Sequence, residues 1–112
     1  MALPSKNRLK NKKDFDAVFK KGKALNGTFL FMKSLLSDRG YPRFGFIVAA
    51  RFASKAVLRN KVRRLLADVI WPELLPNMPS CDTVVVVTKK IPANVLVIRD
   101  DFIAVLRQAR FI

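Results

Sequence analysis

The residues best suited to chemistry form a basic run in the middle of the chain, from Lys55 to Leu66. At about 100° per residue, this run places apolar side chains on one side of a helix and polar ones on the other. An arginine side chain can donate two parallel hydrogen bonds to a phosphate group, and a helix holds several such side chains at fixed positions. We therefore expect this helix to bind a polyanion. The apolar side comprises Leu58, Val62, Leu65, Leu66 and Val69, and the polar side carries Lys55, Arg59, Asn60, Arg63 and Arg64.

The charges of this helix argue against a merely solvated surface, which is the alternative interpretation. Arg59 and Arg63 lie one turn apart, and like charges at that spacing weaken a helix by a few tenths of a kcal/mol. Solvated helix faces usually mix both signs, yet Asp68 is the only acid between Ala53 and Pro72. An external polyanion accounts for this arrangement better than solvent does.

The composition of the whole chain supports a nucleic-acid partner. The 112 residues include 22 Lys and Arg against 8 Asp and Glu, for a formal charge of +14. Hydrophobic residues make up 51%, and nine are Phe, which excludes a disordered basic tail. The length fits one nucleic-acid-binding domain over residues 1–112, in which residues 1–10 are expected to form a mobile basic arm.

A self-sufficient catalyst is not expected. The chain has no His and a single Cys, Cys81, so we predict no catalytic residue and no metal site in the protein. An autonomous nuclease is the enzyme alternative, and it would need carboxylates converging on Mg²⁺. The clustered acids, for which solvation at helix ends is the simpler explanation, are Asp14, Asp16, Asp100 and Asp101.

The hydrophobic pattern predicts three helices and three strands in the order α-β-β-α-β-α. The first two strands are expected to pair antiparallel across a turn, and Ser54 is expected to cap the basic helix. Asp100 and Asp101 are expected in the first turn of the last helix. The helices are predicted at residues 11–21, 54–70 and 99–110, and the strands at residues 28–33, 43–48 and 82–88.

Phe15 and Phe19 share one face of the first helix, where they either fill the core or stack on unpaired bases. Periodicity alone does not decide between the two. The apolar runs are shorter than the ~18 residues that span a bilayer, and no signal segment follows the basic N-terminus. A cytoplasmic protein without a membrane partner is therefore expected.

Several ordered segments resemble the protein component of bacterial ribonuclease P: residues 7–10, 14–22, 45–48, 59–64 and 82–90. The resemblance covers nearly the whole chain, and Lys61 stands where that family's Arg-Asn-Arg signature has its third residue. It implies an α+β fold, an α-β-β-β-α-β-α sandwich of the ribosomal-S5-domain-2-like type. An extra strand would lie near residues 23–25, and a left-handed β-α-β crossover would replace the right-handed form found in about 98% of cases.

The resemblance also implies a function, in which the protein binds the catalytic RNA and the 5′ leader of precursor tRNA. The RNA would carry out phosphodiester hydrolysis and hold most of the Mg²⁺, and no obligate protein partner is expected. The residues expected to bind the RNA subunit are Lys55, Arg59, Asn60, Lys61, Arg63 and Arg64. Those expected to line the leader cleft are Phe15, Phe19, Leu30 and Met32, with Arg8 and Arg51 contacting phosphates.

Three binding classes remain as alternatives. A structural RNA-binding protein of the ribosomal type would also be small and basic but would need no substrate cleft. A helix-turn-helix DNA binder is disfavoured, because no partner helix and short turn precede the basic helix. A membrane-surface helix is disfavoured because the strand-rich remainder of the chain requires a core.

Overall fold

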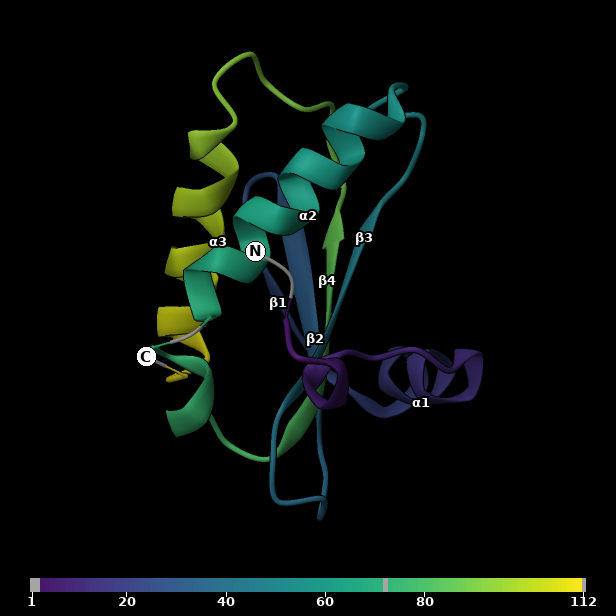
Figure 1. Ribbon diagram of the computed structural model, residues 1–112, viewed down its shortest axis with the longest axis vertical. Helices are drawn as coiled ribbons and strands as arrows, with labels where there is room; N and C mark the ends of the chain where they lie inside the picture. The colour runs from purple at the N-terminus through teal and green to yellow at the C-terminus, as the bar shows by residue number, and fades with distance from the viewer. Residues whose placement is uncertain (1–2, 72, 112) are drawn as a thin grey trace.

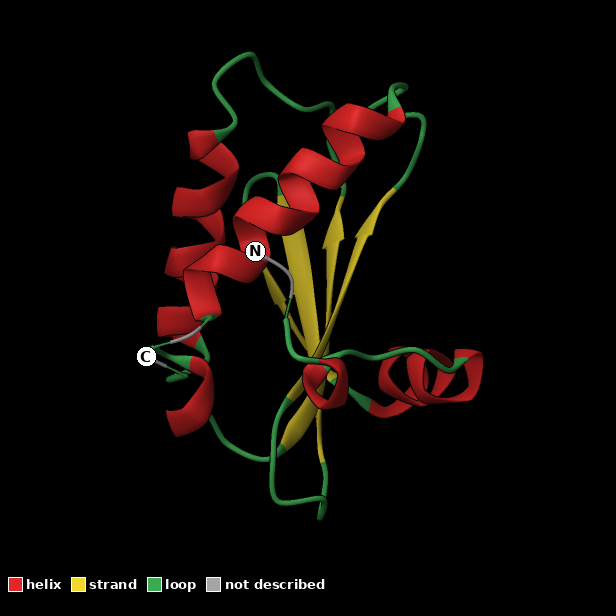
Figure 2. Cartoon of the chain, viewed as in Figure 1, coloured by secondary structure: helices red, strands yellow, loops and turns green. Residues whose placement is uncertain are grey.

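The computed structural model describes residues 3–71 and 73–111. Three α-helices, four strands and two short 3-10 helices occur in the described residues (Figures 1 and 2). The helices are α1 (Lys12–Lys21), α2 (Ala56–Ile70) and α3 (Leu96–Gln108), and the strands are β1 (Lys23–Asn26), β2 (Leu30–Leu36), β3 (Arg43–Val48) and β4 (Cys81–Val87). The 3-10 helices are η1 (Ser5–Asn7) and η2 (Leu75–Asn77). The α-β-β-β-α-β-α order is confirmed, including the extra strand β1.

The four strands form one sheet in the order β1-β2-β4-β3. β4 pairs antiparallel with β2 and parallel with β3, so it is covered on both edges as well as both faces. Its β-branched run suits this position, because a strand buried on both faces needs apolar side chains at consecutive positions. The expected antiparallel pairing of residues 28–33 with 43–48 is wrong, since β4 lies between β2 and β3.

The connection from β3 through α2 to β4 is left-handed, as the family resemblance implied. In Figure 1, β3 and β4 both run upward, α2 crosses in front of the sheet, and β4 lies to the left of β3. A right-handed connection would place β4 on the other side of β3. The crossover carries α2 diagonally over the sheet, with its C-terminal end close to α3 (Figure 2).

Two apolar clusters occupy the two faces of the sheet. The larger cluster lies beneath α2 and α3, where Val62 and Leu66 are buried and Leu58 and Val69 are partly buried. The smaller cluster lies beneath α1, where Val18 packs on Val84. The predicted apolar side of the basic helix therefore faces the main core.

Within residues 3–10, which we expect to form a mobile basic arm, Asn7 and two leucines are buried, whereas Ser5, Lys6, Arg8 and Lys10 are exposed. Leu3 and Leu9 are buried, and the Leu9 N–H donates to the Phe44 carbonyl at 3.0 Å. The Asn7 side-chain amide donates to the Pro42 carbonyl at 2.7 Å. Two apolar side chains spaced among cations thus contact the rest of the fold, and the mobility of the segment stays a prediction. Met1 and Ala2 lie outside the described residues.

The helix ends differ from the sequence-based prediction at two places. Lys55, not Ser54, occupies the N-cap position of α2, and no side chain caps that end. α3 begins at Leu96, so Asp100 and Asp101 lie beyond its first turn. The Asp101 carboxylate accepts backbone N–H hydrogen bonds from Thr28 and Phe29, both at 2.8 Å. Asp101 therefore fixes the β1–β2 turn to α3 instead of stabilising a helix end.

This attachment predicts that Asp101→Ala lowers the free energy of unfolding by ~1 to 3 kcal/mol, because two hydrogen bonds to a partly exposed carboxylate are lost. Asp100→Ala is the matched control, since Asp100 forms an exposed ion pair with Arg99, and this substitution should lower the free energy of unfolding by less than ~1 kcal/mol. Urea denaturation of both variants measures the difference. Equal losses would contradict the assigned role of Asp101.

Candidate nucleic-acid interface

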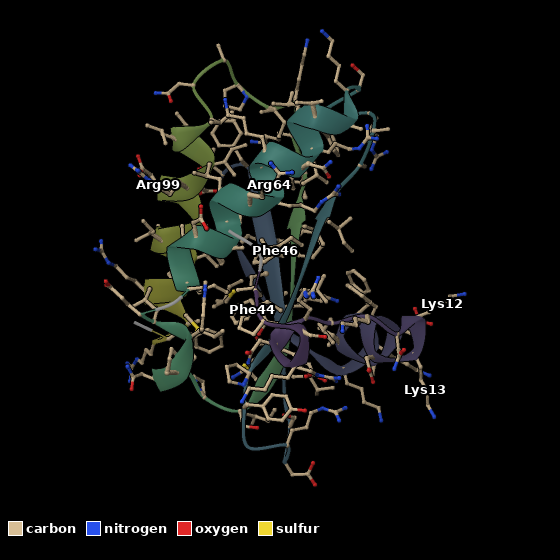
Figure 3. All side chains as sticks on the ribbon, viewed as in Figure 1. Lys12, Lys13, Phe44, Phe46, Arg64 and Arg99 are labelled. Carbon is tan, nitrogen blue, oxygen red and sulfur yellow. The ribbon has the colours of Figure 1, made fainter. Side chains whose placement is uncertain are left out.

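The outward side of α2 presents the predicted cations. Lys55, Asn60, Lys61 and Arg64 are exposed, and Arg59 and Arg63 are partly buried. Figure 3 shows Arg64 on the side of α2 that faces away from the sheet. The sequence-predicted set is therefore brought together on one helix, with the core on the opposite side.

Three of these residues take part in hydrogen bonds within the protein. The Arg59 guanidinium donates through Nη1 to the carbonyls of Ala53 and Ser54, at 2.9 and 3.0 Å. Arg63 donates through Nη2 to the Asn60 side-chain oxygen. Arg59 thus holds the loop that leads into α2, and the Arg63–Asn60 contact orients both side chains on the helix surface.

The residues predicted to line one cleft do not all lie together. Phe15 and Phe19 are partly exposed on α1 and pack against the smaller apolar cluster. Arg51 lies on the loop after β3, with its guanidinium carbon 4.8 Å from the centre of the Phe52 ring. Figure 1 places this loop at the opposite end of β3 from α1. Arg51 is therefore separate from the aromatic residues of α1.

The prediction that Leu30 and Met32 line the same surface as Phe15 and Phe19 is wrong. Both side chains are 1% exposed and belong to the main core beneath α2 and α3. Side chains alternate between the faces of a strand, so the other residues of β2 share the face covered by α1. Those residues are Phe31, Lys33 and Leu35.

Lys33 shows how this face is arranged. Its ammonium donates to the Phe19 carbonyl at 2.7 Å, near the C-terminal end of α1. A cation at that end is favourable because the last carbonyls of a helix carry partial negative charge. The alternation of side chains along β2 was visible in the sequence. Which of the two alternating sets of side chains faces α1 depends on the tertiary fold.

An ion network joins α1 to the sheet. Arg43 donates to both carboxylate oxygens of Asp82, at 2.8 and 2.6 Å, and its Nη1 lies 3.3 Å from Asp14. Arg39 lies at the rim, 3.8 Å from Asp14 and 3.9 Å from Asp82. Hydrogen bonding to Asp82 raises the pKa of Arg43 above its ordinary value, against the opposing effect of burial. Sequence reasoning missed this network because it attributed Asp14 to helix-end solvation.

A pocket of about 280 Å³ connects the two predicted surfaces. Arg63 and Arg64 of α2 line it on one side, and Arg8 and Phe15 line it on the other. The strand residues Phe44, Gly45 and Phe46 form part of its wall. Residues assigned separately to RNA-subunit and leader binding therefore meet in one cavity.

Three of the four carboxylates of the nuclease alternative have structural partners, and Asp16 is exposed on α1. Asp14 faces Arg43, Asp101 accepts backbone hydrogen bonds, and Asp100 pairs with Arg99. Among residues 3–71 and 73–111, no group of three or more His, Cys, Asp or Glu side chains could hold a metal ion. Cys81 is buried, and burial raises the pKa of its thiol, as expected for a structural residue.

The same described residues contain no helix that is both long and apolar enough to cross a membrane.

An α+β sandwich with a cationic helix face and an adjoining aromatic and cationic pocket defines a nucleic-acid-binding protein. Residues 3–110 match the family model described as Ribonuclease P. The chain therefore belongs to the ribonuclease P family.

Relatives and solved structures agree with this assignment. The ribonuclease P protein component of Pseudanabaena sp. (strain PCC 6903) is 32% identical, over 96% of this chain and 95% of the relative. That of Streptococcus mutans is 34% identical, over 75% and 69%. The RNase P protein from Thermotoga maritima in complex with 1-(4-fluorophenyl)-2-thiourea has a TM-score of 0.78 at 26% identity, covering 90% of this chain and 98% of that one. The Staphylococcus aureus RNase P protein has the same fold, with a TM-score of 0.83 at 23% identity over 94% and 96%.

The ion network predicts that Arg43→Met lowers the free energy of unfolding by about 2 to 4 kcal/mol, since Asp82 is 7% exposed and would lose its bidentate partner. Arg99→Met is the matched control, because it breaks an exposed ion pair worth ~0 to 1 kcal/mol. Urea unfolding of the two variants tests the difference. A loss at Arg43 no larger than that at Arg99 would show that the network contributes little.

Proposed function

We propose that this protein is the RNA-binding subunit of ribonuclease P, which binds the ribonuclease P RNA and the 5′ leader of precursor tRNA. The family match over residues 3–110 carries the proposal, because it spans every helix and strand of the described residues. Membership of this family implies tRNA processing in partnership with the ribonuclease P RNA.

The cationic side of α2 is the proposed contact with the RNA subunit. Its exposed side chains, Lys55, Lys61 and Arg64, stand on a helix whose opposite side is buried in the main core. A helix held in this way presents its charges without further ordering, which lowers the entropic cost of binding. RNA helices are recognised largely through shape and backbone, so fixed arginine and lysine positions suit such a partner.

The face around α1 is the proposed contact with the leader. Phe15 and Phe19 expose part of their rings there, and Phe31 and Lys33 on β2 replace Leu30 and Met32 in the assignment. Figure 3 shows Lys12 and Lys13 projecting from the same helix. Aromatic surface flanked by cations suits a single strand with little sequence preference, because every base has a face that can stack.

We assign the hydrolysis to the RNA subunit, which would also hold most of the Mg²⁺. The donor set of the protein supports this assignment, since the chain has no His and Asp14 and Asp101 have structural partners. What the protein supplies is positive charge and position. Neutralising phosphates along two surfaces would bring the leader and the catalytic RNA together.

Arg64 is the sharpest probe of the RNA-subunit contact, because Arg59 also holds the loop before α2. Arg64→Ala should weaken binding to the ribonuclease P RNA by ~1 to 3 kcal/mol and reduce the salt slope by about one ion. Affinity measured at several KCl concentrations tests both effects. Arg107→Ala, which removes an exposed charge from α3, is the control and should change neither quantity appreciably. An effect as large for Arg107 as for Arg64 would indicate nonspecific attraction and reject the assignment.

A further inference from the structure

The pocket between α2 and the N-terminal segment has walls that are set by the fold. Gly45 lies on the edge strand β3, and a Cβ atom placed there would lie 2.6 Å from the Phe15 ring. Phe15 therefore packs directly on the strand backbone, on the side covered by α1. On the opposite side of β3, Phe46 stacks on Phe44 at 6.1 Å between ring centres and meets Phe102 edge-on at 6.0 Å. Both aromatic walls are held by other parts of the core.

Three arginines line this pocket beside its apolar residues. Arg8 comes from the segment before α1, and Arg63 and Arg64 come from one side of α2. None of the described residues that line the pocket is acidic. Residues far apart in sequence thus bring positive charge to a single apolar cavity, and an anionic group with an attached flat ring matches both features.

The size of the pocket limits what it can accept. A volume of about 280 Å³ lies just below the range for small-ligand sites, roughly 300 to 1,000 Å³. A nucleic-acid helix or a folded peptide segment is too large to enter. One base with its phosphate at the rim fits the combination of small volume, aromatic walls and arginines.

We infer that this pocket binds a single unpaired nucleotide, with the base against Phe46 on the α2 side of β3 and the phosphate on the arginines. The inference rests on the proposed function, which supplies an RNA partner. It adds a specific subsite at the junction between the cationic side of α2 and the α1 face. Figure 3 shows Arg64 and Phe46 lying close together in the view at this junction. A nucleotide bound there would join the two RNA-binding surfaces through one contact.

The first test uses adenosine 5′-monophosphate and ribose 5-phosphate as probes, with binding followed by NMR. Adding the nucleotide should shift the Gly45 and Phe46 amide signals and the arginine side-chain signals. All of these shifts should fit the same dissociation constant. Ribose 5-phosphate should shift the arginine signals and bind at least about fivefold more weakly, because it has no base to stack. Equal affinity for the two probes, or nucleotide shifts that miss Gly45 and Phe46, would overturn the inference.

Three variants test the same subsite, and each is checked for folding. Phe46→Leu keeps apolar bulk beside Phe44 and Phe102 but removes the stacking surface, so it should weaken nucleotide binding at least threefold. Arg64→Ala should also weaken it, whereas Arg107→Ala, on α3, should not. A melting curve confirms that each variant is folded. Unchanged nucleotide affinity in a folded Phe46→Leu protein would contradict the proposed base contact.

The RNA partners separate this inference from the function on which it rests. If the unmodified protein binds the ribonuclease P RNA tightly while the probe tests fail, the subsite alone is rejected. If the unmodified protein does not bind that RNA, the proposed function fails whatever the nucleotide probe does. If the protein binds the ribonuclease P RNA and the nucleotide probe as expected, the affinity of Phe46→Leu is measured for the ribonuclease P RNA and for precursor tRNA. The RNA whose affinity falls is the one that supplies the nucleotide.

Discussion

The parallel pairing of β3 with β4 is the constraint on which the other elements depend. Parallel neighbours cannot be joined by a tight turn, so the chain must cross the sheet between them, and α2 is that crossover. Arg43 and Asp82 lie opposite each other where the two strands pair and form a bidentate ion pair there. Arg43 also lies within 3.3 Å of Asp14 on α1, which covers the face of the sheet opposite α2. The ion pair that marks the register of β3 and β4 therefore also holds α1 to the sheet.

The crossover helix links the core to the binding surface. Burial of Val62 and Leu66 holds α2 against the sheet, and this fixes the direction in which Arg64 projects. The repulsion between neighbouring cations is a small cost beside the burial of two large side chains, each worth roughly 1.5 to 3 kcal/mol. A helix held mainly by its apolar side can therefore carry a strongly charged outer side before any RNA binds.

Strong local patterns made part of this structure predictable. The predicted strand at residues 43–48 coincides with β3, and the segregated basic run corresponds closely to α2. The sequence did not disclose which neighbours each strand takes, because an apolar strand pairs equally well with several partners. That choice places Leu30 and Met32 in the main core, and it brings Asp82 opposite Arg43. The packing of residues 3–10 depends on contacts with Phe44 and Pro42, which lie more than 30 positions away along the chain. The ribonuclease P resemblance supplied β1 and the left-handed crossover, which composition and periodicity did not reveal.

The measurement that bears most directly on the central claim is cleavage of a precursor tRNA at its 5′ end by a bacterial ribonuclease P RNA at low Mg²⁺, with and without this protein. If the protein is the subunit proposed, its addition should strongly stimulate cleavage, because neutralising phosphates on both RNAs substitutes for part of the missing divalent cation. The protein alone should cleave nothing. A folded protein that binds the RNA tightly yet leaves the cleavage rate unchanged would contradict the account and favour a structural RNA-binding protein.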